Sequence, residues 1–213
     1  MIEDRHKRKF LDFIFNQIKN LKNPKILEFG VSDKAMSTSF FLDLCEKNNG
    51  NLISVDVNNY KSKFNSSRWH FINTRDDNYE NIDKYLKKDL DVIYLDTVHK
   101  AKHVEKILYH YYENLKVNGF FFIDDISWLP YTKEREKNHF YKEINNQETF
   151  EKLIQIYNKN LGKFDIEFSF VGTGIAKLTK LNNDKLLTSS KILLRKNSLK
   201  NILRKLYLVF KSK

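Results

Sequence analysis

The chain has 213 residues, of which 41% are hydrophobic and 31% charged, and its formal net charge is +11. This composition supplies enough apolar material for one domain with a hydrophobic core and excludes wholesale disorder, while only 6 Gly and 2 Pro exclude collagen-like classes. The single cysteine, Cys45, excludes a disulfide scaffold and a cysteine-based zinc cluster.

The first half of the chain alternates between predicted helices and strands. Apolar residues that share one helical face predict an amphipathic helix over 4–21. Ser37 or Thr38 is expected to cap a second helix that ends at Lys47. Short apolar runs predict three strands: KILEFGV at 25–31, NLISVDV at 51–57 and WHFIN at 69–73.

The second half continues this alternation. Further helices are predicted over 78–88, 101–116 and 147–161, and further strands over 90–96 and 120–124. Asn118-Gly119 is expected to end the helix that precedes the last of these strands. DIEFSFVG and GIAKLTK then predict a closing antiparallel hairpin. Together these elements predict an α/β fold with a doubly wound, mostly parallel seven-stranded sheet and a C-terminal antiparallel hairpin.

Acidic residues lie at the carboxyl ends of four predicted strands, which is the edge where a doubly wound sheet binds ligands. They are Glu28, Asp56, Asp96 and the pair Asp124-Asp125. An unpaired carboxylate is costly at the end of an apolar strand. Four such strand ends therefore indicate a cleft that binds a ligand.

The first two strand ends suit a nucleoside. Asp56 offers two acceptor oxygens for ribose hydroxyls, and Gly30 lets the chain pass close to a ligand. A dinucleotide site requires Gly-x-Gly-x-x-Gly, whereas Gly30 is followed here by Val-Ser-Asp-Lys-Ala. An uncharged or cationic group beside Glu28 and Asp33 therefore fits better than a pyrophosphate.

The other two strand ends suit a metal ion. Asp96, Asp124 and Asp125 bring together three carboxylates that repel one another unless a cation intervenes. Hard oxygen ligands favour Mg²⁺, Ca²⁺ or Mn²⁺, and the nearby His99 suits general-base chemistry. An isolated Asp-Asp pair is more often a solvated turn, but Asp96 and His99 at matching strand ends favour the metal site.

The segments ILEFGV, ISVDV, DVIYLDTVHKAKHV and LKVNGFFFIDDISW, in this order, resemble class I S-adenosylmethionine-dependent methyltransferases. The most similar subgroup has a hydrophobic strand, I-D-G-x-H-x-Y, a helix, L-K-x-G-G, a strand and D-D. It includes macrolide and other sugar O-methyltransferases and cephalosporin hydroxylase-like proteins. The resemblance covers about residues 24–130 and implies a Rossmann-like methyltransferase domain over 1–184, with an N-terminal helix over 1–22.

The resemblance also implies roles for the strand-end residues. It assigns S-adenosylmethionine binding to Glu28, Gly30, Ser32, Asp56, Asp76 and Asp96. It assigns Mg²⁺ or another divalent cation to Asp96, Asp124 and Asp125. His99, beside Asp96, matches the proposed catalytic base of the sugar-modifying branch, and Lys100 is the alternative from the catechol-type branch. The sequence departs from the family pattern at Ser32 and Lys34, where small residues are usual, and at Thr97, where glycine is common.

The implied activity is Mg-dependent methyl transfer to a hydroxyl of a sugar or other small polyol, in a protein that, like many of this family, forms a homodimer. Two alternatives stay open: a nucleic-acid methyltransferase anchored by a basic tail, and a non-catalytic cofactor-binding protein with a reduced glycine loop. The aromatic segment 126–146 follows the fifth strand and is a candidate lid on the acceptor side, with ordinary packing as an equally good explanation.

The positive charge is concentrated in a tail. Residues 185–213 contain nine Lys or Arg and no Asp or Glu, whereas 1–184 contain 29 basic and 27 acidic residues. Apolar residues recur there at helical spacing: Leu199, Ile202, Leu203, Leu206 and Phe210. This predicts a basic amphipathic helix that contacts an anionic membrane surface, a partner groove or the body of the protein itself.

The near-neutral body argues against nucleic acid as a partner. The sequence shows no apolar run of about 18 residues and no secretory signal, so we expect a cytoplasmic protein. If the tail binds lipid, the protein would lie at the inner face of a membrane.

Overall fold

The computed structural model describes residues 9–86, 88–128, 140–188 and 199–211. Its seven strands form one sheet in the order β3-β2-β1-β4-β5-β7-β6. The strands are β1 Lys25–Phe29, β2 Asn51–Asp56, β3 Trp69–Asn73, β4 Leu90–Leu95, β5 Leu115–Asp124, β6 Phe164–Ser169 and β7 Ile175–Lys180. The first five are parallel, and β7 runs antiparallel to both β5 and β6. The predicted fold class is therefore confirmed.

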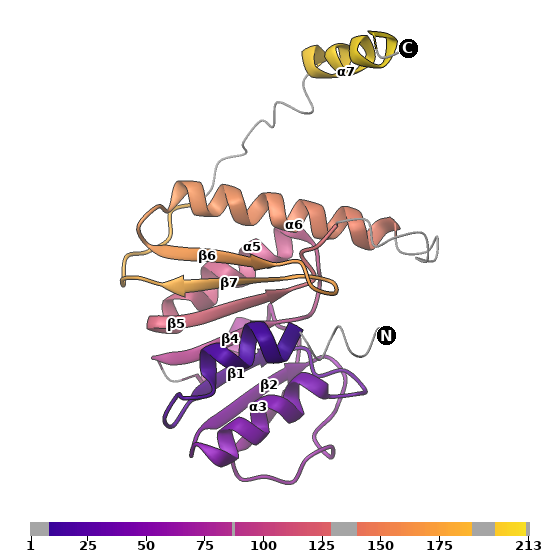
Figure 1. Ribbon diagram of the computed structural model, residues 1–213. Helices are drawn as coiled ribbons and strands as arrows, with labels where there is room; N and C mark the ends of the chain where they lie inside the picture. Colours follow the sequence, from indigo (N-terminus) through magenta and orange to yellow (C-terminus); the bar gives the residue numbers. More distant parts are fainter. Residues whose placement is uncertain (1–8, 87, 129–139, 189–198, 212–213) are drawn as a thin grey trace.

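Helices cover both faces of the sheet (Figure 1). The helices of the described residues, of which α7 lies apart from the sheet, are η1 Lys9–Phe15, α2 Asn16–Ile18, α3 Met36–Lys47, α4 Tyr79–Asp83, α5 Ala101–Tyr111, η2 Tyr112–Asn114, α6 Phe140–Lys159 and α7 Leu199–Lys211. Successive residues of a strand point to opposite faces of the sheet and pack into two separate hydrophobic cores. On one face Ile26 packs with residues of η1, α2 and α3, and on the other Leu27 packs with residues of α4, α5 and α6. Both cores are buried at the centre of the sheet.

Several element boundaries differ from those predicted. The helix expected over 101–116 ends at Tyr111 and continues as the short turn η2, because Leu115 already pairs with Leu90 as the first residue of β5. Asn118, with φ +63°, therefore lies within an irregular part of β5 and does not terminate a helix. The helix expected over 78–88 is limited to 79–83. In the region expected to be one helix over 4–21, the described part is π-helical in η1 and α-helical in α2.

Within the described residues, the structure contains no helix that is both long and apolar enough to cross a membrane. Most of the candidate lid at 126–146 lies outside the described residues.

Candidate functional site

Gly30 forms the turn after β1 in a backbone conformation that favours glycine, with φ +96°. Its N–H donates to the carbonyl of Val55 on β2 at 2.9 Å, and the N–H of Asp96 donates to the carbonyl of Phe29 at 2.9 Å. A Cβ atom at Gly30 would lie 2.0 Å from the carbonyl oxygen of Asp96. The ends of β1, β2 and β4 are therefore joined around a position that excludes any side chain.

The loop after Gly30 keeps its course without further glycines. Ser32 and Ala35 both have positive φ values, +60° and +44°. Such a conformation costs a non-glycine residue about 1–2 kcal/mol, and strain of this kind tends to collect at functional sites. The sequence departs from the family pattern at Ser32, where a small residue is usual. The backbone there nevertheless has the left-handed conformation that a glycine would adopt.

Asp56, at the end of β2, faces this loop. Its Oδ2 accepts the Val31 N–H at 2.8 Å and its Oδ1 accepts the Asn58 N–H at 2.8 Å. The two backbone donors fix the plane of the half-buried carboxylate. Each carboxylate oxygen has a second lone pair, so this orientation is compatible with accepting a pair of vicinal hydroxyls.

Glu28 lies beneath the loop and is completely buried. Its two oxygens accept the Ser37 hydroxyl at 2.6 Å and the Ser54 hydroxyl at 2.7 Å. Burial raises the pKa of Glu28 to about 7, although the serine hydrogen bonds oppose the shift. Ser37 therefore does not cap α3 as expected. That helix begins after the left-handed Ala35, and Glu28 can reach a ligand only through its neighbours.

The raised pKa of Glu28 predicts a pH-dependent stability. The folded protein holds a proton that the unfolded chain, with an ordinary pKa of 4.5, releases between about pH 4.5 and about pH 7. This contribution is present below pH 4.5 and is lost as the pH rises through 7, by about 2–3 kcal/mol. Urea unfolding at about pH 5 and pH 8 should show this loss in the natural protein and not in Glu28→Gln. Equal losses in both proteins would assign the pH dependence to other groups.

At the carboxyl ends of β4 and β5, three carboxylates surround an imidazole and a phenol. The Nε2 atom of His99 lies 3.5 Å from Oδ1 of Asp96 and 3.4 Å from Oδ2 of Asp125. The Tyr94 hydroxyl donates to Oδ2 of Asp124 at 2.7 Å and lies 3.4 Å from Oδ2 of Asp96. The structure thus brings the predicted residues Asp96, His99, Asp124 and Asp125 together.

Tyr94 belongs to this group, although its place in an apolar strand gives no functional signal. Burial, followed by the neighbouring carboxylates, raises the pKa of Tyr94 far above its ordinary value. It therefore stays a neutral donor between Asp96 and Asp124. Asp125 adopts φ +57°, and its N–H donates both to the Asp124 side chain at 2.7 Å and to the Gly174 carbonyl at 3.0 Å. The β6–β7 turn thus supports the acidic pair.

Asp76, the predicted adenine-side residue, is buried in a separate network. Its Oδ2 accepts the Thr97 hydroxyl and lies 2.7 Å from Nε2 of His103. Asp76, Asp77 and His103 also form a compact group of metal-type ligands within the described chain. Arg75 makes a two-point ion pair with Asp77 at 2.8 and 2.9 Å, so a guanidinium group already balances the charge of Asp77. Thr97 stands where the family often has glycine, and here it ties the β3 and β4 loops together.

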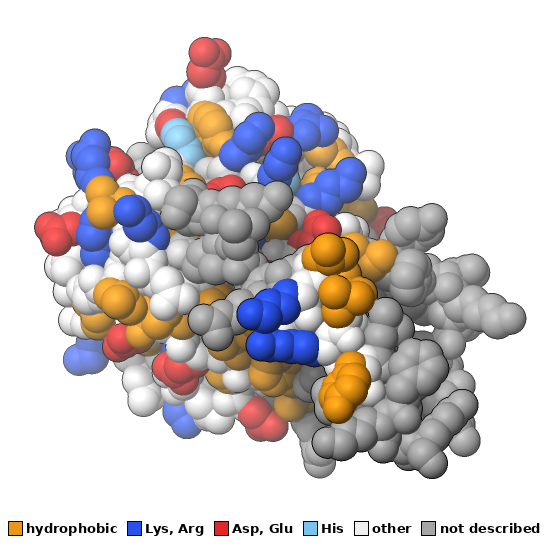
Figure 2. All heavy atoms as spheres, turned by 90° about the horizontal axis from the view of Figure 1, so that it is seen from above, with side chains coloured by type: hydrophobic (Ala, Val, Ile, Leu, Met, Phe, Trp, Pro, Cys, Tyr) orange, Lys and Arg blue, Asp and Glu red, His pale blue; other side chains and the backbone are white. Residues whose placement is uncertain are grey.

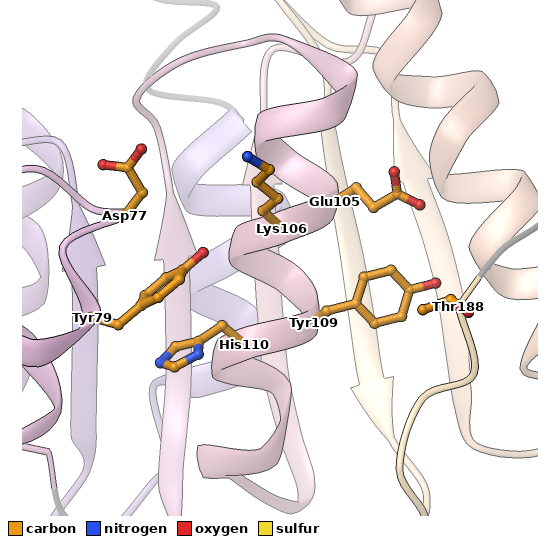
Figure 3. Close-up of a pocket in the computed structure, with 7 residues that line it drawn as sticks. All are labelled: Asp77, Tyr79, Glu105, Lys106, Tyr109, His110 and Thr188. Carbon is orange, nitrogen blue, oxygen red and sulfur yellow. The ribbon is translucent and has the colours of Figure 1, made fainter.

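A groove of about 790 Å³ lies on the outer side of α5 (Figure 3). It is lined by Asp77, Tyr79, Glu105, Lys106, Tyr109, His110 and Thr188. The rings of Tyr79 and His110 stack at 3.8 Å in its wall. The residues that line it include none of those predicted to bind the cofactor, so the groove is not the predicted cofactor site.

The strand order, the antiparallel hairpin and the strand-end acids define the class I methyltransferase fold. Residues 27–126 match the model of a family described as a methyltransferase domain, from β1 to just past β5. The predicted resemblance to methyltransferases is confirmed over residues 27–126, which carry a methyltransferase domain. A search of curated protein sequences finds no match.

Solved structures with this fold include several methyltransferases. The methyltransferase PaMTH1 of Podospora anserina, bound to S-adenosylhomocysteine, superposes with a TM-score of 0.60 at 14% identity, covering 85% of this chain and 88% of its own. The MycE methyltransferase of mycinamycin biosynthesis, in complex with Mg and S-adenosylhomocysteine, gives a TM-score of 0.61 at 17% identity over 89% of this chain and 57% of MycE. A Staphylococcus aureus protein assigned as a caffeoyl-CoA O-methyltransferase gives a TM-score of 0.59 at 16% identity, covering 84% of this chain and 92% of its own. At these identities the likeness establishes the fold, and this chain spans little more than half of MycE.

Proposed function

We propose that the protein transfers a methyl group from S-adenosylmethionine to a hydroxyl of a sugar or other small polyol, with Mg²⁺ or another divalent cation. The observation that carries this proposal is the position of the His99 imidazole between Asp96 and Asp125, at the strand ends beside the Gly30 turn. The nearness of an imidazole to carboxylate oxygens at one edge of the sheet supports general-base chemistry beside a hard cation. The Mg and S-adenosylhomocysteine bound to MycE, a structure of the same fold, support the choice.

The residues present fit the cofactor. Gly30 removes the side chain that would block close approach, and Asp56 presents a carboxylate held by two backbone donors for the ribose hydroxyls. Ser32, exposed on the same loop, is our candidate for contact with the methionine part. Asp76 is buried against Thr97 and His103, so it would act on the adenine side only through these neighbours. Glu28 supports the loop from below through Ser37.

The three strand-end acids supply carboxylate oxygens, the donors that a hard cation prefers. Asp96, Asp124 and Asp125 would hold Mg²⁺ through carboxylate oxygens, while Tyr94 orients Asp124. When bound, S-adenosylmethionine supplies the methyl group and Mg²⁺ polarises the acceptor oxygen. His99 would accept at its imidazole the proton that the acceptor hydroxyl loses when it is methylated. Alignment of the acceptor oxygen with the methyl group is the chief task of the surrounding side chains.

Calorimetric titration with S-adenosylhomocysteine, with Mg²⁺ and with a chelator, tests this proposal. We expect a Kd on the order of micromolar and a loss of about 10-fold or more in Asp56→Ala, because the ribose hydroxyls lose their acceptors. Asp124→Asn should keep cofactor binding but lose Mg²⁺ stimulation of methyl transfer to a panel of sugars. Asp165→Asn, an exposed acid on β6, is the matched control.

The outcomes separate the parts of the proposal. Lack of S-adenosylhomocysteine binding under both conditions would favour a non-catalytic protein. Full transfer activity in excess chelator would contradict the proposed metal site but not the proposed methyl transfer. The homodimer is likewise a proposal, and light scattering of the purified protein would test it.

A further inference from the structure

Helix α7 presents apolar side chains to solvent. The exposed fractions are 75% for Leu199, 47% for Ile202, 58% for Leu203 and 63% for Tyr207. The inward residues of α5 show the opposite behaviour, since Val104, Ile107 and Leu108 are at most 2% exposed. The body of the protein therefore does not bury this part of α7, in contrast to one of the arrangements that the sequence left open.

These side chains form one face of the helix. Leu199, Ile202 and Leu203 lie within one turn of each other on the same side, and Leu206 and Phe210 continue the spacing in sequence. Lys200 and Arg204 are exposed beside this face. Seen from above, hydrophobic and basic side chains lie next to each other on the side of the molecule where α7 lies (Figures 1 and 2). The helix thus has an apolar face with a basic border.

The charge around this face has one sign. No Asp or Glu occurs in 185–213, which carries nine Lys or Arg, while the preceding 184 residues are nearly balanced. A nucleic acid would complement the charge but would leave the apolar face in water. An anionic bilayer complements both, because its headgroups attract Lys and Arg while its acyl boundary takes up Leu and Ile.

We propose that α7 binds the surface of an anionic lipid bilayer, with the apolar face in the headgroup–acyl boundary and Lys200 and Arg204 at lipid phosphates. The helix would lie in the plane of the bilayer and would not cross it. The methyltransferase domain would then be held close to the membrane. This surface acts independently of the acceptor and of the metal, so it stands or falls separately from the proposed reaction.

Co-sedimentation of the full chain with phosphatidylcholine vesicles, with and without one quarter phosphatidylglycerol, tests this proposal. We expect binding to the anionic vesicles at about 50 mM salt and a strong loss at about 500 mM, because salt screens the basic side chains. The double variant Ile202→Ser/Leu203→Ser should bind at least about 10-fold more weakly, because it loses buried apolar area. Lys200→Gln/Arg204→Gln should bind several-fold more weakly and show a smaller salt effect.

Matched controls come from the body. Leu161→Ser removes an apolar side chain that is 64% exposed, and Lys47→Gln/Lys159→Gln removes two exposed charges. Both should bind vesicles like the natural protein. The proposal is wrong if the full chain stays in solution with anionic vesicles, or if Ile202→Ser/Leu203→Ser binds them unchanged. The proposal is also wrong if the protein binds single-stranded RNA in a salt-dependent manner and does not bind vesicles. The tail would then be a nucleic-acid-binding surface.

Discussion

His99→Ala should lose about 10²–10⁴-fold in methyl transfer while binding S-adenosylhomocysteine as tightly as the natural protein. The range is what a positioned general base contributes, and His99, the proposed base, lies between Asp96 and Asp125. The measurement is S-adenosylhomocysteine production with the best acceptor of a sugar panel, together with calorimetry of cofactor binding.

Two further variants sharpen this test. His99→Gln keeps a hydrogen-bonding side chain but cannot take a proton at neutral pH, so it should be as inactive as His99→Ala. His70→Ala removes an exposed histidine from β3 and should be fully active. If His99→Ala kept its turnover, another group, with Lys100 first, would have to act as the base. If it lost cofactor binding as well, His99 would be a structural residue.

Gly30→Ala should abolish cofactor binding and destabilise the fold by about 3 kcal/mol or more. The new Cβ atom would meet the Asp96 carbonyl oxygen at 2.0 Å, a backbone atom that cannot move without separating β1 from β4. The positive φ adds a conformational cost of its own, about 1–2 kcal/mol. Urea unfolding and S-adenosylhomocysteine titration measure the two effects.

Gly162→Ala is the matched control for the backbone cost. Gly162 has φ +80°, and an added Cβ would meet nothing within 4 Å. This variant should therefore show the conformational penalty alone, about 1–2 kcal/mol, with unchanged cofactor binding. If both alanine variants were equally stable, the close approach of Gly30 to Asp96 would not constrain the site.

Periodicity and strand-ending acids were sufficient to predict the sheet and the hairpin. The apolar runs around Leu27, Ile93 and Phe121 are buried on both faces, so they stand out in sequence as strands of a covered parallel sheet. The end of α5 was predicted wrongly because Asn118-Gly119 looks like a helix stop. Leu115 enters the sheet earlier, and this long-range pairing with β4 has no local signal.

In the candidate site, too, some contacts between residues far apart in sequence could not be predicted. The juxtaposition of His99 with Asp96 and Asp125 follows from strand order and could be predicted. The hydrogen bond from Ser37 to Glu28 could not be predicted, because a serine at the start of a helix is equally typical of capping. Tyr94 and His103 were missed for a related reason, since one lies within an apolar strand and the other on an amphipathic helix, where their roles depend on carboxylates far away in sequence.

Because β7 pairs with β5 in the sheet, one part of the candidate site can form only late in translation. Gly30, Asp56 and Asp96 lie at the ends of strands that are all translated before α5 is complete. The backbone of Asp125, in contrast, is held by Gly174 in a turn made some fifty residues later. A nascent chain that ends after α5 but before Gly174 could therefore form the turn at Gly30 beside Asp56 and Asp96. It would lack the backbone hydrogen bond that holds Asp125. It would also leave one edge of β5 unpaired, an edge that invites aggregation until the hairpin arrives.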